Sequence, residues 1–189
     1  MEYKQHHVGS LVTGALIGTL TSTGEIGSAA IDAVKKIVVT ALRDTSEVTT
    51  TATQVAGDIT GAAIHTAIDI GSDAGTALHH AIHGVIHGVN DIGGYLGTTA
   101  EHAAKGAIKA TNEVGGDLGK TAVSIVRGTI AATAQVGGDV GHVSERAVKG
   151  VLDGAREISQ TAVGTVSDAI ENSIVEAKDI VHSAVKKHQ

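Results

Sequence analysis

Two stretches of this chain are nearly identical and begin 22 residues apart: VGGDLG at residues 114–119 and VGGDVG at residues 136–141. Related phrases, IGSDAG at 70–75 and IGGYLG at 92–97, extend the same spacing backwards. Halfway between these phrases lies a second one, rich in Ile and Val, as in IVRGTI at 125–130. The elementary period is therefore eleven residues, doubled to 22 by alternating Gly-rich and Ile/Val-rich halves.

Apolar residues recur along the chain with helical spacing. In rows of eleven that start at Ile26, columns 1, 2, 5, 6 and 9 hold mostly apolar or small residues, whereas column 11 is mostly polar. These columns fall on one face of a helix, because a strand would alternate at every second residue. The chain also contains no Pro, the residue that breaks helix interiors. The pattern predicts an all-α protein.

Over residues 15–185 the period resembles that of hendecad coiled coils. Eleven residues in three turns give about 3.67 residues per turn, which favours a right-handed supercoil. The resemblance implies a long, nearly continuous helix that joins copies of itself in a right-handed homo-oligomeric coiled coil or helical bundle. We expect an N-terminal segment at 1–14, one repeat region at 15–185 and a C-terminal tail at 186–189.

The sequence has to be read for one long helix or for several shorter ones. The unbroken phase favours one long helix, because a turn between helices normally shifts the register. Against continuity stand 25 Gly residues, each costing about 0.5–1 kcal/mol relative to Ala in a helix interior. We favour the long helix, with bends expected at the Gly-Gly pairs 93–94, 115–116 and 137–138. Its exposed apolar stripe would need partner helices or a lipid surface.

Glycines four residues apart recur with the register, which places them on one helix face. Removing side chains there lets another backbone approach closely, as in glycine-zipper association. The alternative is compositional drift made periodic by duplication. Further pairs of this spacing lie at 57/61, 84/88 and 150/154. The predicted helix-packing residues are Gly71, Gly75, Gly93, Gly97, Gly115, Gly119, Gly137 and Gly141.

The densest group of titratable side chains is a histidine cluster. His79, His83 and His87 are spaced four apart, so they run along one helical stripe. Imidazoles at this spacing can share a transition-metal ion, which makes these three residues candidate metal ligands. A structural zinc site has four ligands, however, and one helix offers two at a time. The alternative is a polar stripe or a pH-responsive face.

Composition argues against several classes of function. The net charge of −6 disfavours nonspecific nucleic-acid binding, which needs a basic face. The lack of Cys removes thiolate nucleophiles and thiolate metal sites. Gly119-Lys120-Thr121 resembles the end of a phosphate-binding loop, but Val114 stands where that loop requires its first Gly. We therefore expect no enzyme activity and no cofactor.

Two functions fit these features. The first is a structural, self-assembling helical protein, forming a bundle, fibre or sheath whose partner is the chain itself. The alternative is a membrane-associated or membrane-inserting protein, suggested by the uncharged stretch 8–24, which lacks the basic region of a cleaved signal peptide. The chain lacks the bulky apolar and Lys/Arg-rich faces of lipid-surface helices. A weaker alternative is metal-linked assembly through the histidines.

Overall fold

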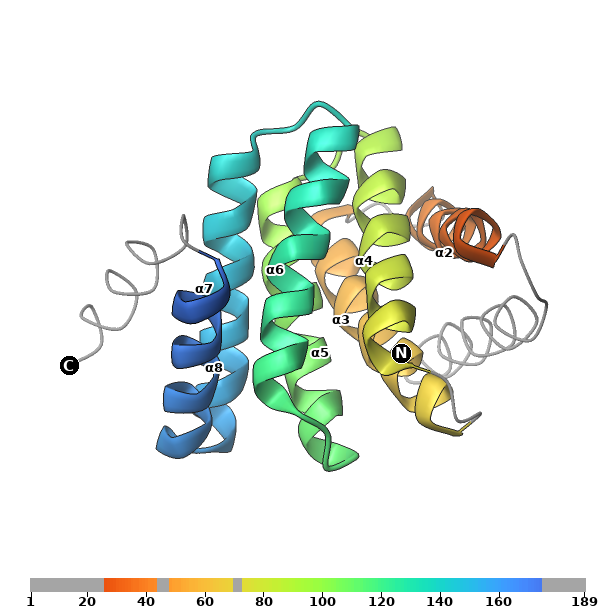
Figure 1. Ribbon diagram of the computed structural model, residues 1–189. Helices are drawn as coiled ribbons and strands as arrows, with labels where there is room; N and C mark the ends of the chain where they lie inside the picture. Colours follow the sequence, from red (N-terminus) through yellow and green to blue (C-terminus); the bar gives the residue numbers. More distant parts are fainter. Residues whose placement is uncertain (1–25, 44–47, 70–72, 175–189) are drawn as a thin grey trace.

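The computed structural model describes residues 26–43, 48–69 and 73–174, and over these residues the chain is all-helical without strands. This confirms the all-α prediction (Figure 1). The described helices are α2 (Ile26–Arg43), α3 (Val48–Asp69), α4 (Ala74–Asp91), α5 (Leu96–Glu113), α6 (Leu118–Gln135), α7 (Val140–Ile158) and α8 (Gln160–Ser173).

The prediction of a long, nearly continuous helix is wrong, because the repeat forms separate helices joined by short turns. Helices α4, α5 and α6 have 18 residues each, and four residues separate each of them from the next. One 22-residue repeat is thus one helix plus one turn. Eighteen residues complete about five helical turns. Each of these three helices therefore begins and ends on the same face. The register survives because the turn is part of the repeat.

The Gly-Gly pairs, where the sequence predicted bends in a long helix, form turns between separate helices. After α5, the N–H of Gly116 donates to the carbonyl of Thr111 at 2.8 Å and that of Gly115 to Asn112 at 3.1 Å. These two bonds form a Schellman motif, which ends a helix with a left-handed residue. Gly115 accordingly has a φ of +67°. The same bonds and a positive φ recur at Gly93 and Gly137.

These three glycines are therefore turn residues, and a role for them in packing between copies of the chain stays a prediction. Within the described part of the chain, a Cβ atom added to any of them would meet nothing within 4 Å. Their regular spacing follows from the turns, whose backbone conformation is unfavourable for residues with a Cβ.

Aspartates begin most of the helices that follow these turns. The Asp117 carboxylate accepts a hydrogen bond from the backbone N–H of Lys120 at 3.0 Å, which satisfies one of the open donors at the start of α6. Asp73 and Asp139 cap α4 and α7 in the same way. The α7–α8 junction differs: Ser159 alone separates the helices and caps α8 through its hydroxyl.

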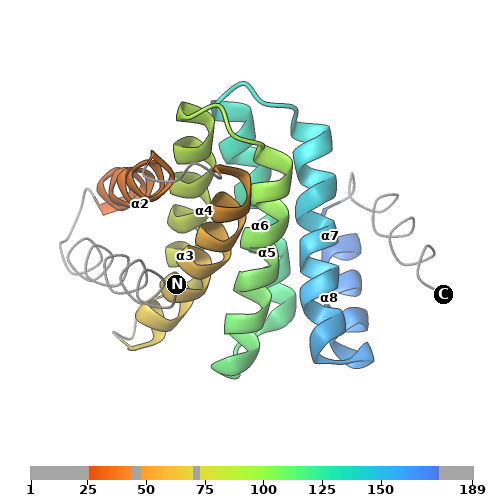
Figure 2. The same cartoon turned by 180° about the vertical axis from the view of Figure 1, so that it is seen from behind.

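Helices two positions apart in the chain make the most extensive contacts, α5 with α7, α3 with α5 and α2 with α4. Consecutive helices share less surface. The result is two layers, one of α3, α5 and α7 and the other of α2, α4, α6 and α8. Figures 1 and 2 show α4 to α8 running nearly side by side, with α3 tilted and α2 lying across α4.

The same sequence separation recurs between residues that pair across neighbouring helices of one layer. Polar pairs join residues 48 positions apart, which is two repeats plus about one helical turn. The same rule therefore sets the packing of α3 on α5, α4 on α6 and α5 on α7. The pairs are His65–Glu113, His87–Gln135 and Glu101–Lys149.

The apolar stripe is buried within the chain by aliphatic and Ala side chains. Among the described residues, the only large apolar side chains that are exposed are Ile68 and Tyr95. The helices therefore supply one another with the partners that a single long helix would have lacked. No described helix combines the length and hydropathy needed to cross a membrane. The stretch 8–24 lies outside the described residues.

Several helix pairs approach at glycine. A Cβ atom on Gly106 of α5 would lie 2.5 Å from the carbonyl oxygen of Gly57 on α3, and one on Gly84 would lie 2.5 Å from the Val34 Cβ. Backbone thus packs against backbone in the first case. Of the predicted packing residues, Gly97 faces α7 and Gly119 faces α8. Gly75 and Gly141 lie nearest the aspartates that cap their own helices. Gly71 lies outside the described residues.

Gly106→Ala should destabilise the chain by about 2 kcal/mol, because the new methyl group cannot avoid the α3 backbone. Gly61→Ala is the matched control on the same interface. Its Cβ would lie 3.6 Å from the Ala110 Cβ, an ordinary contact, so the better helix former should be neutral or stabilising. Urea denaturation measures both, and equal midpoints would refute close α3–α5 packing.

Gly115→Ala and Gly164→Ala should shift stability in opposite directions, although neither new methyl would meet a neighbour. The left-handed conformation at Gly115 costs an L-residue about 1–2 kcal/mol. Gly164 lies within α8, where Ala is favoured by about 0.5–1 kcal/mol. Denaturation midpoints that move together would contradict the left-handed turn.

Candidate functional site

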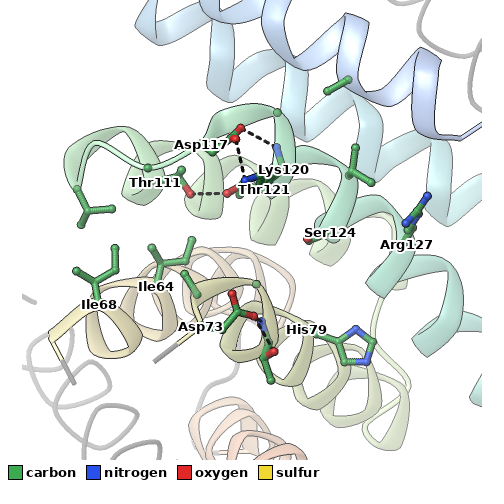
Figure 3. A pocket seen from close by; sticks show the side chains of 18 of the residues that line it. Ile64, Ile68, Asp73, His79, Thr111, Asp117, Lys120, Thr121, Ser124 and Arg127 are labelled. Atoms are coloured by element: carbon green, nitrogen blue, oxygen red, sulfur yellow. Dashed lines mark hydrogen bonds and ion pairs between the residues drawn. The ribbon is translucent and has the colours of Figure 1, made fainter. Parts of the chain in front are cut away.

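A cavity of about 960 Å³ opens where α3, α4, α5, α6 and α8 meet (Figure 3). The start of α4 and the start of α6 supply two of its sides. Aliphatic side chains and small residues form much of the wall, with a few polar groups between them. Cavities of this size and character are typical of small-molecule sites. The apolar lining residues include Ile64, Ile68, Val114, Val123 and Ala169.

The cavity differs in polarity from one end to the other. Ile64 and Ile68, on the last turns of α3, lie at one end in Figure 3. His79 of α4 and the Ser124 and Arg127 side chains of α6 lie at the opposite end. Ile68 is one of the two exposed large apolar side chains among the described residues, with 44% of its surface accessible. The apolar end is therefore also open.

Both carboxylates in the lining are occupied as helix caps. Asp73 accepts hydrogen bonds from the backbone N–H and the hydroxyl of Thr76, both at 2.7 Å. Both bonds lower the pKa of Asp73, and the bond from the Thr76 hydroxyl has the larger effect. The backbone N–H of Lys120 likewise lowers the pKa of Asp117, whose second oxygen lies 3.6 Å from the Lys120 Nζ. Both acids are held as charged caps, where the helix dipole favours negative charge.

Arg127 is the cation of the polar end. Its Nη2 donates to the carbonyl oxygen of Ser173 at 3.0 Å, at the end of α8. Within the described part of the chain Arg127 forms no ion pair with a carboxylate, in contrast to Lys105, Lys109 and Lys149, which pair with Glu157 or Glu101. Its positive charge is therefore not neutralised by an acidic side chain of the site.

The histidine stripe adjoins this polar end. The ring centroids of His79 and His83 are 4.2 Å apart and those of His83 and His87 are 6.2 Å apart, so the three do share one face. His87 Nε2 lies 3.2 Å from the side-chain oxygen of Gln135 on α6. His83 is only 3% exposed, and its Nε2 has no hydrogen-bond partner. The stripe is thus buried at its centre rather than solvated along its length.

Burial, together with the neighbouring His79 and His87, lowers the pKa of His83 to about 4, while Gln135 opposes the shift. Among the described residues, no acidic side chain acts on it. The imidazole is therefore neutral at pH 7. Burial also lowers the pKa values of His80 and His102.

Metal binding by His79, His83 and His87 stays a prediction. The described residues contain no group of three or more His, Cys, Asp or Glu side chains placed to hold a metal ion. The three rings lie along one stripe, as the sequence predicted, but α6 offers them Gln135 rather than a further imidazole or carboxylate.

Comparison with known proteins gives no relative: no protein-family model matches the chain, and no curated protein matches it significantly.

Sequence reasoning missed Ile68, Ser124 and Arg127 as site residues. The cavity is formed by helix ends far apart in the chain, and no local motif announces it. One signal was available. A basic residue recurs every 22 positions in the Ile/Val-rich phrase, at His83, Lys105, Arg127 and Lys149. The last three each pair with another helix through an ion pair or hydrogen bond.

Acidification should destabilise the chain through His83. Its folded pKa of about 4 lies below the ordinary value of 6.5, so the unfolded chain takes up the proton first as the pH falls. Stability is retained above pH 6.5 and lost between pH 6.5 and 4, by about 2 kcal/mol at pH 5 relative to pH 7.5.

His83→Leu should reduce that difference, because the side chain no longer titrates. The comparison is urea denaturation of each variant at pH 7.5 and pH 5. His142→Gln, at an exposed position on α7, is the control and should keep the wild-type difference. If His83→Leu loses as much stability on acidification as the wild type does, His83 is not the titrating group.

Proposed function

We propose that this chain is a structural, non-enzymatic helical-repeat protein that assembles with copies of itself. The observation that carries the proposal is the repeated packing rule, by which each helix contacts the helix two positions away with residues 48 apart paired. A stack in which each unit contacts only its neighbours is open to extension at its ends.

The ends of the described stack support this proposal. Among the described helices, α5 packs between α3 and α7 in its own layer, whereas α8 has only α6 there and α2 has only α4. Thr161, Gly164, Asp168 and Asn172 form an exposed stripe on α8 at helical spacing. These small and polar side chains leave room for a helix of a second copy. The oligomer of the proposal is thus a side-by-side addition of two-layer stacks, instead of the coiled coil of single helices first expected.

Membrane association is the alternative proposal. It rests on the uncharged stretch 8–24 and on the Gly-rich composition of the chain. Flotation with phosphatidylcholine liposomes, with and without residues 8–24, separates the two proposals. Flotation that depends on this stretch would favour the alternative.

Sedimentation velocity tests the assembly directly. We expect an elongated species with a mass that is a multiple of 18.9 kDa. Gly164→Arg should shift the protein towards 18.9 kDa, since nothing lies within 4 Å of a Cβ at this position and the longer side chain would project from α8. Asn112→Arg adds the same charge at an exposed position on α5 and should leave the mass unchanged. A wild-type protein of 18.9 kDa at all concentrations would overturn self-assembly.

A further inference from the structure

We propose that the cavity between α3, α4, α6 and α8 binds an amphipathic monocarboxylate with a long aliphatic chain, of the fatty-acid type. This site is independent of the assembly proposed above. It takes the chain from a purely structural element to one that also carries a small apolar ligand.

The aliphatic end of the ligand fits the α3 side of the cavity. Ile64 is buried and Ile68 is half-exposed, and both line the cavity at the same end in Figure 3. An apolar chain laid against them would cover Ile68, which is otherwise in contact with water. Burial of apolar surface at this end would supply most of the binding free energy.

The carboxylate of the ligand fits the opposite end. Arg127 has five N–H donors. The hydrogen bond to the Ser173 carbonyl uses only the Nη2 nitrogen. A guanidinium matches the planar fork of a carboxylate. Ser124 and His79 also line this end of the cavity (Figure 3) and offer a hydroxyl and an imidazole to the ligand.

The balance of charge favours a single negative group on the ligand. The two acids in the lining are held as caps of α4 and α6, and Lys120 pairs with Asp117. These charges offset one another or the helix termini. Arg127 is left as a cation without an acidic partner among the described residues, so one carboxylate would complete the site. A cationic ligand would meet Arg127 with like charge.

Isothermal titration of the full-length protein with decanoate, below its micelle concentration, tests the site. We expect about one decanoate per chain. Arg127→Gln should weaken decanoate binding about tenfold or more, with Arg127→Lys between the two, because a lysine retains the charge but not the fork. Decan-1-ol should bind the wild type and Arg127→Gln alike, since it carries no carboxylate.

Ile68→Asn tests the apolar end and should weaken both decanoate and decan-1-ol, with folding checked by circular dichroism. Its position is partly exposed, so the helix should tolerate the change. Lys36→Gln removes an exposed positive charge from α2, away from the cavity, and should bind decanoate as the wild type does. The proposal is overturned if decanoate does not bind, if Arg127→Gln and Ile68→Asn bind it normally, or if Lys36→Gln loses it equally.

Discussion

The left-handed glycine at the end of each central helix is the constraint on which the rest of the structure depends. It reverses the chain after 18 residues. Asp117 and Asp139 then start the helices that follow Gly115 and Gly137, whereas Tyr95 stands at this place after Gly93. A longer or shorter turn would rotate the apolar stripe of the next helix away from the core, because successive residues lie about 100° apart around the helix axis. With the turn fixed at four residues, α4, α5 and α6 each enter the stack with the apolar stripe towards the core. Both layers, and the cavity at their junction, follow from this repetition.

Small residues then decide how closely neighbouring helices of one layer pack. The chain has no Phe or Trp, so its core is built from Ile, Val, Leu and Ala, and adequate packing density requires short distances between helices. Glycines at 57 and 106 allow two backbones to meet, and glycines at 84 and 88 admit Val34 and Val38 of α2. The same closeness buries His83 between α4 and α6. Its lowered pKa is thus a consequence of packing rather than of a designed set of charges.

The sequence predicted the helical class, the 22-residue unit and the Gly-Gly pairs as the places where a helix would bend. It failed on continuity. Register was taken as evidence against turns, whereas a turn of four residues added to five full helical turns restores the register after each unit. Gly93, Gly115 and Gly137 were expected on a helix face but lie in turns with a positive φ, because a periodic glycine looks the same in the sequence whether it supplies space or a positive φ. The histidine stripe was found from spacing alone, although its burial was not. The cavity could not have been predicted, since its lining residues on α3, α6 and α8, such as Ile68, Arg127 and Ser173, are brought to one cavity only by helix packing.

The preference of each helix for the helix two positions later has a consequence for synthesis on the ribosome. When α5 leaves the exit tunnel, its most extensive contact in the chain, with α7, does not yet exist. The matching residues follow two repeats later, and at about 5–20 residues per second this amounts to a wait of roughly 2–9 s. During that interval the apolar face of the newest helix is covered on the side of its predecessor only. The apolar surface at the growing end of the nascent chain is therefore the last to be covered.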